Sequence, residues 1–409
     1  MHKKIITITI ILTCLLTCLS SASLVSANDW PMFHHDQAHT GYVNTTGPTT
    51  NQILWTYTTN DDAGSSPCVV NGIAYVGSSD GNVYALNAIS GAKVWNCTIA
   101  GGVMSSPCVV DGVVYVGAGD DNVYALDAST GTKIWNYTTG EVVLSSPCVA
   151  NGIVYVGSFD YNVYALNATS GAKIWSYLTG YAVFSSPCVV NGIVYIGSSD
   201  GYAYALNATS GSKVWSYKAQ NYMGVTPCVV NGIAYFGSRD HNLYALDAVS
   251  GTKLWAFSAD DHISGLCVAN GVVYVGSVDH NMYALNAASG AKIWTYSTSD
   301  VLTSSPCVTN NILYFGSIDR NVYALNVTDG AKIWNYTTGG SVVSSPCIAD
   351  DIVYVGSYDG LLYAFGTKTT TATVASIDWI YYIITAALVI IAFIVVAAIY
   401  RRKSRAYRK

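Results

Sequence analysis

The chain has 409 residues, of which 51% are apolar and 11% are charged. This balance excludes a disordered protein and predicts a large buried core. The net charge of −5 is unevenly distributed, because eight of the 19 basic residues lie near the two ends and all 24 acidic residues lie between them. The acidic middle excludes nucleic acid as a partner. With 32 Tyr, 37 Gly and a single Glu, at Glu141, the composition favours strands and tight turns, and we expect an all-β protein.

Residues 1–27 have the layout of a secretory signal peptide. Two lysines near the start precede an apolar run over residues 5–19, and small residues lead up to Ala27. We expect cleavage after Ala27. Lipidation at Cys18 is the weaker alternative, since the Thr before it fits a lipoprotein signal poorly.

After a lead-in segment, residues 28–51, one unit is repeated eight times, and such a fixed period is typical of propellers and solenoids. The cysteines of the units are 40 residues apart, with one interval of 39: Cys68, Cys108, Cys148, Cys188, Cys228, Cys267, Cys307 and Cys347. The tryptophans keep the same spacing: Trp55, Trp95, Trp135, Trp175, Trp215, Trp255, Trp294 and Trp334.

Each unit contains four strand signals. In the first unit they read SSPCVV, IAYVGS, VYALN and a segment that carries Trp95, separated by turns such as Asn71-Gly72. The eighth unit lacks a fourth strand, whereas residues 52–57 form a fourth strand with no unit before it. We therefore predict an eight-bladed β-propeller over residues 52–366, with four-stranded antiparallel blades and the N-terminal strand completing the last blade.

Three segments follow the propeller. Residues 367–376 are Thr-rich and are predicted to form a short stalk. Residues 377–400 are predicted to form a transmembrane helix, because they contain a 20-residue apolar stretch with aromatic residues at its borders. The basic tail, residues 401–409, is then cytoplasmic by the positive-inside rule. We expect a cell-membrane protein with a single span and an extracellular propeller.

The end of each unit carries a recognisable motif. AxNxxSGxxxW at Ala85–Trp95 and AxDxxTGxxxW at Ala125–Trp135 resemble the tryptophan-docking repeat of pyrroloquinoline quinone (PQQ)-like propellers, the quinoprotein alcohol dehydrogenase-like superfamily. The segment WPMFHHDQAHTG at Trp30–Gly41 is similar to the lead-in of these propellers. The resemblance implies that each tryptophan stacks between blades on the backbone of a neighbouring blade.

The resemblance leaves the function open between two classes. Quinone-dependent dehydrogenases of the superfamily hold PQQ beside a disulfide of adjacent cysteines, with calcium bound by Glu, Asn and Asp. This chain has no adjacent cysteine pair, and its sole Glu lies in a turn. Other members are binding proteins without a cofactor, such as the bacterial outer-membrane assembly lipoprotein and exported archaeal surface proteins. We expect a non-catalytic, membrane-anchored member without cofactor or metal, acting as a binding or scaffold module of the cell envelope.

Several repeated polar residues have both a functional and a structural interpretation. The ring of eight cysteines suggests a soft-metal site, but a small apolar slot between blades is the favoured explanation. The histidines at 34, 35 and 39 lack partners at ligand spacing, so we expect a structural role for them too. An Asp in each unit suggests calcium, but capping of its own turn is favoured. These are Asp80, Asp120, Asp160, Asp200, Asp240, Asp279, Asp319 and Asp359.

The copies differ most in two turns that lie on one face of the predicted disc, before each first strand and between the second and third strands. Unit six is also one residue shorter and reads ISGLC before its second strand. Since the chain leaves the propeller toward the opposite face, the variable rim is predicted to face away from the membrane and to bind an envelope protein or a glycan. A structural coat protein is a further alternative. The candidate rim residues are Tyr181, Lys218, Tyr222, Arg239, His241, Asp260, Asp261, His262, His280 and Arg320.

Overall fold

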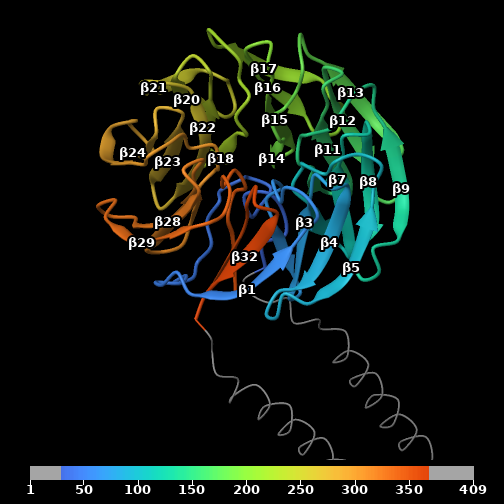
Figure 1. Ribbon diagram of the computed structural model, residues 1–409. Helices are drawn as coiled ribbons and strands as arrows, with labels where there is room; N and C mark the ends of the chain where they lie inside the picture. Colours follow the sequence, from blue (N-terminus) through green and yellow to red (C-terminus); the bar gives the residue numbers. More distant parts are fainter. Residues whose placement is uncertain (1–28, 368–409) are drawn as a thin grey trace, which may run out of the picture. The chain divides into compact units, whose positions relative to one another are not determined.

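The structure, a computed structural model, describes residues 29–367. It contains eight four-stranded antiparallel sheets arranged as blades around a central axis (Figure 1). Within blades 1 to 7, the strands follow one another in sheet order, as in β2-β3-β4-β5. The predicted all-β, eight-bladed propeller is therefore confirmed.

The strands have the following bounds. Blades 1 to 4 consist of β2 (Cys68–Val70), β3 (Ile73–Gly77), β4 (Asn82–Asn87), β5 (Lys93–Thr98); β6 (Cys108–Val110), β7 (Val113–Gly117), β8 (Asn122–Asp127), β9 (Lys133–Thr138); β10 (Cys148–Ala150), β11 (Ile153–Gly157), β12 (Asn162–Asn167), β13 (Lys173–Leu178); and β14 (Cys188–Val190), β15 (Ile193–Gly197), β16 (Tyr202–Asn207), β17 (Lys213–Lys218). Blades 5 to 8 consist of β18 (Cys228–Val230), β19 (Ile233–Gly237), β20 (Asn242–Asp247), β21 (Lys253–Ser258); β22 (Ile263–Ala269), β23 (Val272–Ser277), β24 (Asn281–Asn286), β25 (Lys292–Ser297); β26 (Cys307–Val308), β27 (Ile312–Gly316), β28 (Asn321–Asn326), β29 (Lys332–Thr337); and β30 (Cys347–Ala349), β31 (Ile352–Gly356), β32 (Leu361–Phe365) with β1 (Ile53–Thr58).

The middle strands of each blade are buried on both faces. In β3 and β4, for example, nearly every residue is buried, whereas exposed residues alternate with the buried Trp95 in β5. Neighbouring blades cover both faces of a middle strand, which explains the continuous apolar sequence. The clusters of buried side chains also cross the blade boundaries, since Cys68 of blade 1 packs in one cluster with Val109 of blade 2.

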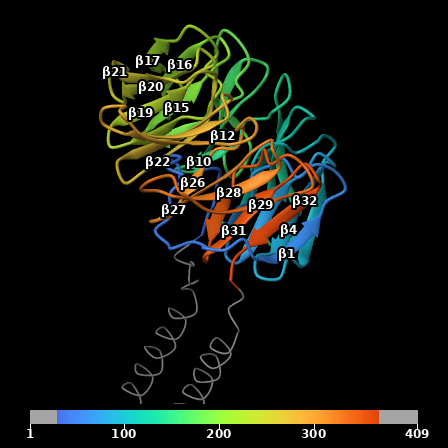
Figure 2. The same ribbon diagram turned by 60° about the vertical axis from the view of Figure 1, so that its left-hand side comes forward.

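The ring closes between the first and the last strands. Strand β1 pairs antiparallel with β32, with Trp55 opposite Ala364, and both figures of the whole chain show the two strands side by side (Figure 2). The prediction that the N-terminal strand completes the eighth blade is confirmed. Closure gives β32 a paired strand on both sides, and exposed strand edges are sites of aggregation.

The first strands are shorter than predicted in seven of the eight blades. SSPCVV was expected to be a strand, but β2 begins only at Cys68. Pro67 has no N–H to donate, and the N–H of Ser66 donates to Ser106 Oγ of the next blade. In blade 6 a leucine replaces this proline, and β22 extends over Ile263–Ala269.

The tryptophans connect each blade to a neighbour, as the resemblance implied. Trp135 Nε1 donates to the carbonyl of Ala168 at 2.9 Å, and Gly171 lies against its ring. Gly171 has a φ of +71°, and a Cβ added there would lie 2.7 Å from the Trp135 ring, so a glycine is required. Six of the other seven tryptophans make the equivalent bond 32 or 33 residues ahead: Trp55, Trp95, Trp175, Trp215, Trp255 and Trp294.

The lead-in segment supplies the eighth docking carbonyl and covers one end of the central axis. Trp334 Nε1 donates to the carbonyl of Pro48 at 3.1 Å. Before that point, the lead-in exchanges backbone hydrogen bonds with the first strands of successive blades, from Trp30 with Val69 to Val43 with Val308. These contacts lie at the C-terminal ends of the first strands, beside the turns into the second strands. The lead-in therefore covers the face opposite the variable turns.

The predicted signal peptide at 1–27, the transmembrane helix at 377–400 and the basic tail at 401–409 lie outside the described residues. The predicted stalk at 367–376 also lies outside them, apart from its first residue. Within residues 29–367, no helix is long and apolar enough to cross a membrane.

Candidate functional site

A cavity opens on the face that carries the variable turns. We call it the mouth cavity; its volume is about 500 Å³, and residues of blades 4 to 7 line it. The lining residues are Tyr181, Phe184, Ser199, Tyr222, Gly224, Val225, Arg239, His262, Ile263, Ser264, Val278 and Thr303. Four of the ten candidate rim residues, namely Tyr181, Tyr222, Arg239 and His262, are among them.

Aromatic rings form one side of the mouth cavity. The ring of Tyr181 lies nearly parallel to that of Tyr161, with centroids 5.1 Å apart, and to that of Tyr222, at 6.4 Å. The guanidinium of Arg239 lies 5.7 Å from the centroid of the Tyr222 ring, within cation–π range. Tyr181 and Tyr222 are 48% and 42% exposed. A row of accessible parallel rings next to a cation is thus available to a ligand.

The base of the mouth cavity contains polar groups without partners. In six of the eight blades, the N–H of the serine two residues before the ring cysteine donates to the equivalent hydroxyl of the next blade, as from Ser146 to Ser186 at 2.9 Å. Gly265 of the shortened unit has no hydroxyl, and a Cβ there would lie 2.6 Å from Ser305. Beside this gap, the hydroxyls of Ser264 and Thr303 are buried and make no hydrogen bond. Both residues line the mouth cavity, and their hydrogen-bonding capacity is unsatisfied.

The other candidate rim residues lie around the cavity without lining it. Lys218 donates to the carbonyl of Asp200, and its Nζ lies 4.3 Å from the centroid of the Tyr202 ring. The N–H of Asp260 donates to Asp279 in the next turn. His280 and Arg320 are exposed at the corresponding turns of blades 6 and 7.

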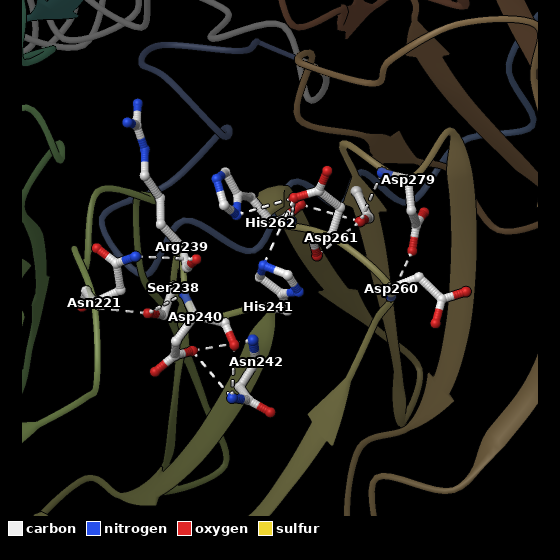
Figure 3. A network of polar contacts seen from close by, with 11 residues as sticks. Asn221, Ser238, Arg239, Asp240, His241, Asn242, Asp260, Asp261, His262 and Asp279 are labelled. Carbon is white, nitrogen blue, oxygen red and sulfur yellow. Dashed lines mark hydrogen bonds and ion pairs between the residues drawn. The ribbon is translucent and has the colours of Figure 1, made fainter.

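His241, Asp261 and His262 come together at the junction of blades 5 and 6. Asp261 Oδ1 lies 3.1 Å from His262 Nδ1 and 3.8 Å from His241 Nε2. Figure 3 shows both imidazoles directed at this carboxylate, with His241 on one turn and the other two residues on the next loop. The adjacency of Asp261 and His262 is visible in the sequence. The approach of His241, 20 residues earlier, depends on the docking of the two blades.

The ring of cysteines is buried as the structural interpretation predicted. All eight are at most 1% exposed, and the nine cysteines within the described residues are free thiols. Burial raises the pKa of Cys108 to about 12 and raises the pKa values of the other ring thiols. The ring is therefore protonated at neutral pH, and the thiolate is the form that reacts and binds metals.

The repeated aspartates cap their own turns, as predicted. Asp160 Oδ1 accepts from the N–H of Asn162 at 2.9 Å, and all eight repeats make the equivalent bond. Asp160 Oδ2 also accepts from the hydroxyl of Tyr164 at 2.6 Å and from the N–H of Gly140 in the preceding loop at 2.7 Å. Seven of the eight carboxylates accept such a bond from the preceding loop and thus join two turns, a role that accounts for their repetition.

The lead-in histidines are also structural. His34 and His39 are 3% and 1% exposed, and His39 Nδ1 lies 3.3 Å from the carbonyl of Pro227. Burial lowers the pKa of His34 to about 3 and that of His39 to about 4. Both imidazoles are neutral at physiological pH and form part of the packing between the lead-in and the blades.

A second cavity, of about 720 Å³, lies on the lead-in side. The lead-in lines it together with Val189 and Asn191 of blade 4. This cavity was not predicted from the sequence, because the period of the units does not encode the path of a non-repeated segment across the blades. Its blade residues are common to several units, whereas the mouth cavity is lined by residues that differ between copies.

Fold, docking tryptophans and lead-in together define a PQQ-like repeat propeller. The family model described as the β-propeller of beta-alanine-activating enzyme matches residues 37–272, and the chain belongs to this propeller family. A second model, described as outer membrane protein assembly factor BamB, matches residues 286–381. No curated protein matches the sequence.

Solved structures share the same architecture. BamB from Moraxella catarrhalis superposes with a TM-score of 0.67 at 22% identity, covering 78% of this chain and 98% of that one. Quinohemoprotein alcohol dehydrogenase from Comamonas testosteroni gives 0.73 at 17% identity, covering 85% and 82%. The computationally designed Ika8 protein gives 0.71 at 17% identity, covering 77% and 100%. At these identities the likeness concerns the fold alone.

The residues that hold the quinone and calcium in the dehydrogenases have no counterpart among the described residues. The resemblance to dehydrogenases requires a disulfide of adjacent cysteines, whereas the described cysteines are single, free and far from one another in sequence. Calcium in those enzymes is held partly by Glu, and Glu141 is exposed in the loop before blade 3. We therefore derive no quinone chemistry for this chain.

Proposed function

We propose that the chain is a non-catalytic binding module of the cell envelope and that it binds a protein partner through the mouth cavity. One observation carries the proposal. Residues that differ between the copies, among them Tyr181, Tyr222 and Arg239, converge on a single cavity whose lining also includes unpaired hydroxyls. The similarity to BamB-type repeats supports a scaffold role in an envelope assembly.

The chemistry of the mouth cavity suits a protein segment. Tyr and Arg are enriched at the energetic centres of protein interfaces, and Tyr181, Tyr222 and Arg239 present both types together. An inserted loop of the partner would bury the exposed rings and give hydrogen-bond partners to Ser264 and Thr303. The other end of the axis is covered by the lead-in, so access from that side is restricted.

We also propose that the propeller lies outside the cell. A signal peptide at 1–27 and a membrane span at 377–400 would hold the propeller outside the cell on a single anchor. The chain leaves the last blade after β32, which runs away from the turns between second and third strands. The mouth cavity would then face away from the membrane and be open to envelope components.

Capture of crosslinked partners from envelope material tests the proposal. The full-length chain is compared with a triple variant, Tyr181→Ala, Tyr222→Ala and Arg239→Ala. The matched control is Ile89→Ala with Val249→Ala, which removes exposed apolar side chains from turns on the opposite face. We expect a protein captured by the wild type and the control to be lost from the triple variant.

Other outcomes contradict the proposal in distinct ways. A partner retained by the triple variant would exclude the mouth cavity as its site. Capture of a glycan would assign the cavity to a different class of ligand, and capture of further copies of this chain would favour a coat protein.

A further inference from the structure

We propose that His241, Asp261 and His262 form a binding site for a divalent transition-metal ion of the zinc class. This inference departs from the expectation of no metal site that we drew from the sequence. It does not depend on the proposed partner, because it concerns the three side chains alone. Two imidazoles and one carboxylate are a donor set that transition metals prefer, whereas calcium and magnesium prefer oxygen ligands.

The distances between the donor atoms suit such an ion. Ligands about 2.0 to 2.1 Å from a tetrahedral zinc ion lie about 3.3 Å from one another. Asp261 Oδ1 is 3.1 Å from one imidazole nitrogen and 3.8 Å from the other, and all three donor atoms lie within 4.8 Å. The imidazoles need only rotate slightly toward each other. Their side chains are 37% and 44% exposed, so the packing permits this rotation.

The backbone fixes two of the ligands in place. Ser277 Oγ donates to the carbonyls of both Asp261 and His262, at 3.2 and 3.0 Å, and the N–H of Val278 donates to the same His262 carbonyl at 2.9 Å. Despite its distance of 3.1 Å from the carboxylate, His262 Nδ1 makes no hydrogen bond and is shielded from solvent. This nitrogen faces the Asp261 carboxylate without a hydrogen bond, and an ion bound between the two groups would satisfy both.

His241 occupies a turn position whose backbone has a positive φ in every blade. Its φ is +72°, and the equivalent turn position is Gly81, Gly201 or Gly360 in three other blades. A side chain at positive φ has a conformational cost of about 1 kcal/mol. The chain has only seven histidines, and three of them, at 241, 262 and 280, lie within 40 residues on this rim.

The next blade junction provides a natural comparison within the chain. His280 has a φ of +73°, and Asp300 accepts from the N–H of Val301 at 2.8 Å, as Asp261 accepts from His262. Ser317 Oγ contacts the carbonyls of Asp300 and Val301, as Ser277 does in the first junction. The two junctions therefore share a backbone frame, and Val301 stands where the second imidazole would be. The second junction offers two ligands instead of three.

Zinc titration of the purified, metal-stripped full-length chain tests the site, with a chromogenic chelator as competitor. We expect His241→Ala, His262→Ala and Asp261→Asn each to weaken zinc binding at this site at least about tenfold, since even loss of a residue that only supports a ligand costs about 10- to 100-fold. His280→Ala is the matched control and should leave binding unchanged. Equal affinity in the wild type and the three variants would overturn the proposal.

Two further measurements separate this site from the cysteines. Cobalt bound in place of zinc should give visible ligand-field bands without the near-ultraviolet charge-transfer band of a thiolate ligand, and a thiolate band that persists in the three variants would overturn the assignment. Val301→His should add a second metal equivalent by completing the second junction. An unchanged stoichiometry in that variant would show that these three positions are not sufficient. Circular dichroism of each variant checks that the propeller remains folded.

Discussion

The two ends of the central axis are built in different ways. At the lead-in end, a non-repeated segment makes backbone hydrogen bonds with six of the eight blades at the same position of their first strands. At the mouth end, side chains that differ between blades surround a cavity, and two buried hydroxyls have no partner. Backbone contacts depend little on side-chain identity, so the structure of the lead-in end follows from positions that the blades share. The structure of the mouth end follows from positions at which the blades differ.

The largest effect is expected where blades dock. Trp135→Ala removes a ring that packs against Gly171 and donates to Ala168 of the next blade. Loss of a buried Trp costs about 3 to 5 kcal/mol, and we expect a corresponding fall in the free energy of unfolding, measured by denaturant titration. Tyr222→Ala, at the mouth, is the control. A loss below about 1 kcal/mol for Trp135→Ala would show that docking is not where the stability resides.

Acid should destabilise the lead-in end next. His34 and His39 are buried and neutral in the folded chain, with pKa values of about 3 and about 4, and the unfolded side chains titrate near 6.5. The unfolded chain therefore binds more protons between about pH 4 and 6.5, and stability falls as the pH falls through this window. For His39 the loss is about 3 kcal/mol.

Thermal unfolding at pH 7 and pH 4.5 measures this effect. His39→Asn keeps a side chain that tolerates the positive φ of this position but does not titrate. The variant should lose less stability than the wild type between the two pH values, whatever its stability at pH 7. An equal loss in both proteins would assign the acid sensitivity to other groups.

A smaller effect is expected from the caps that join turns. Asp160→Ala removes the acceptor of the Tyr164 hydroxyl and of two backbone N–H groups. Leaving a buried donor unsatisfied costs about 1 to 3 kcal/mol, so the free energy of unfolding should fall by an amount in this range. Glu141→Ala, in an exposed loop of the same face, should leave it within about 0.5 kcal/mol. If both substitutions lowered the free energy of unfolding equally, repeated turn residues would contribute no more to stability than variable ones.

The smallest effect on stability is expected at the mouth cavity itself. Tyr181→Ala and Tyr222→Ala remove side chains that are close to half exposed, and each should change the free energy of unfolding by less than about 0.5 kcal/mol. The same denaturant titration measures both. A loss as large as that of Trp135→Ala would mean that these rings belong to the framework and would remove the basis for a binding role.

The repeat made most of the fold predictable from the sequence. Blade number, docking tryptophans, the turn caps and ring closure all follow from residues that recur at one spacing, such as Trp95 and Asp80. The short first strands were not predicted, because Pro67 withdraws a donor from the sheet and Ser66 bonds to another blade. Contacts between blades are long-range and lie outside any single unit.

The candidate site was predictable only in part. Divergence between copies pointed to the rim residues, but it did not separate those that line the cavity from Lys218 or Arg320, which do not. The shortened unit six was visible as ISGLC, whereas the lack of a hydrogen-bond partner at Ser264 and at Thr303 of the next unit was not. The meeting of His241 with Asp261 likewise requires the geometry of two docked blades.

The pairing of β1 with β32 also determines at which stage of synthesis the ring of blades can close. The strand that contains Trp55 is synthesised before any blade, and its partner around Ala364 is synthesised after all the others. Pairings so distant in sequence form slowly, and open sheet edges remain exposed until they form. A chain that stops before the last blade therefore leaves its first strand without a partner. Ring closure thus distinguishes complete chains from incomplete ones.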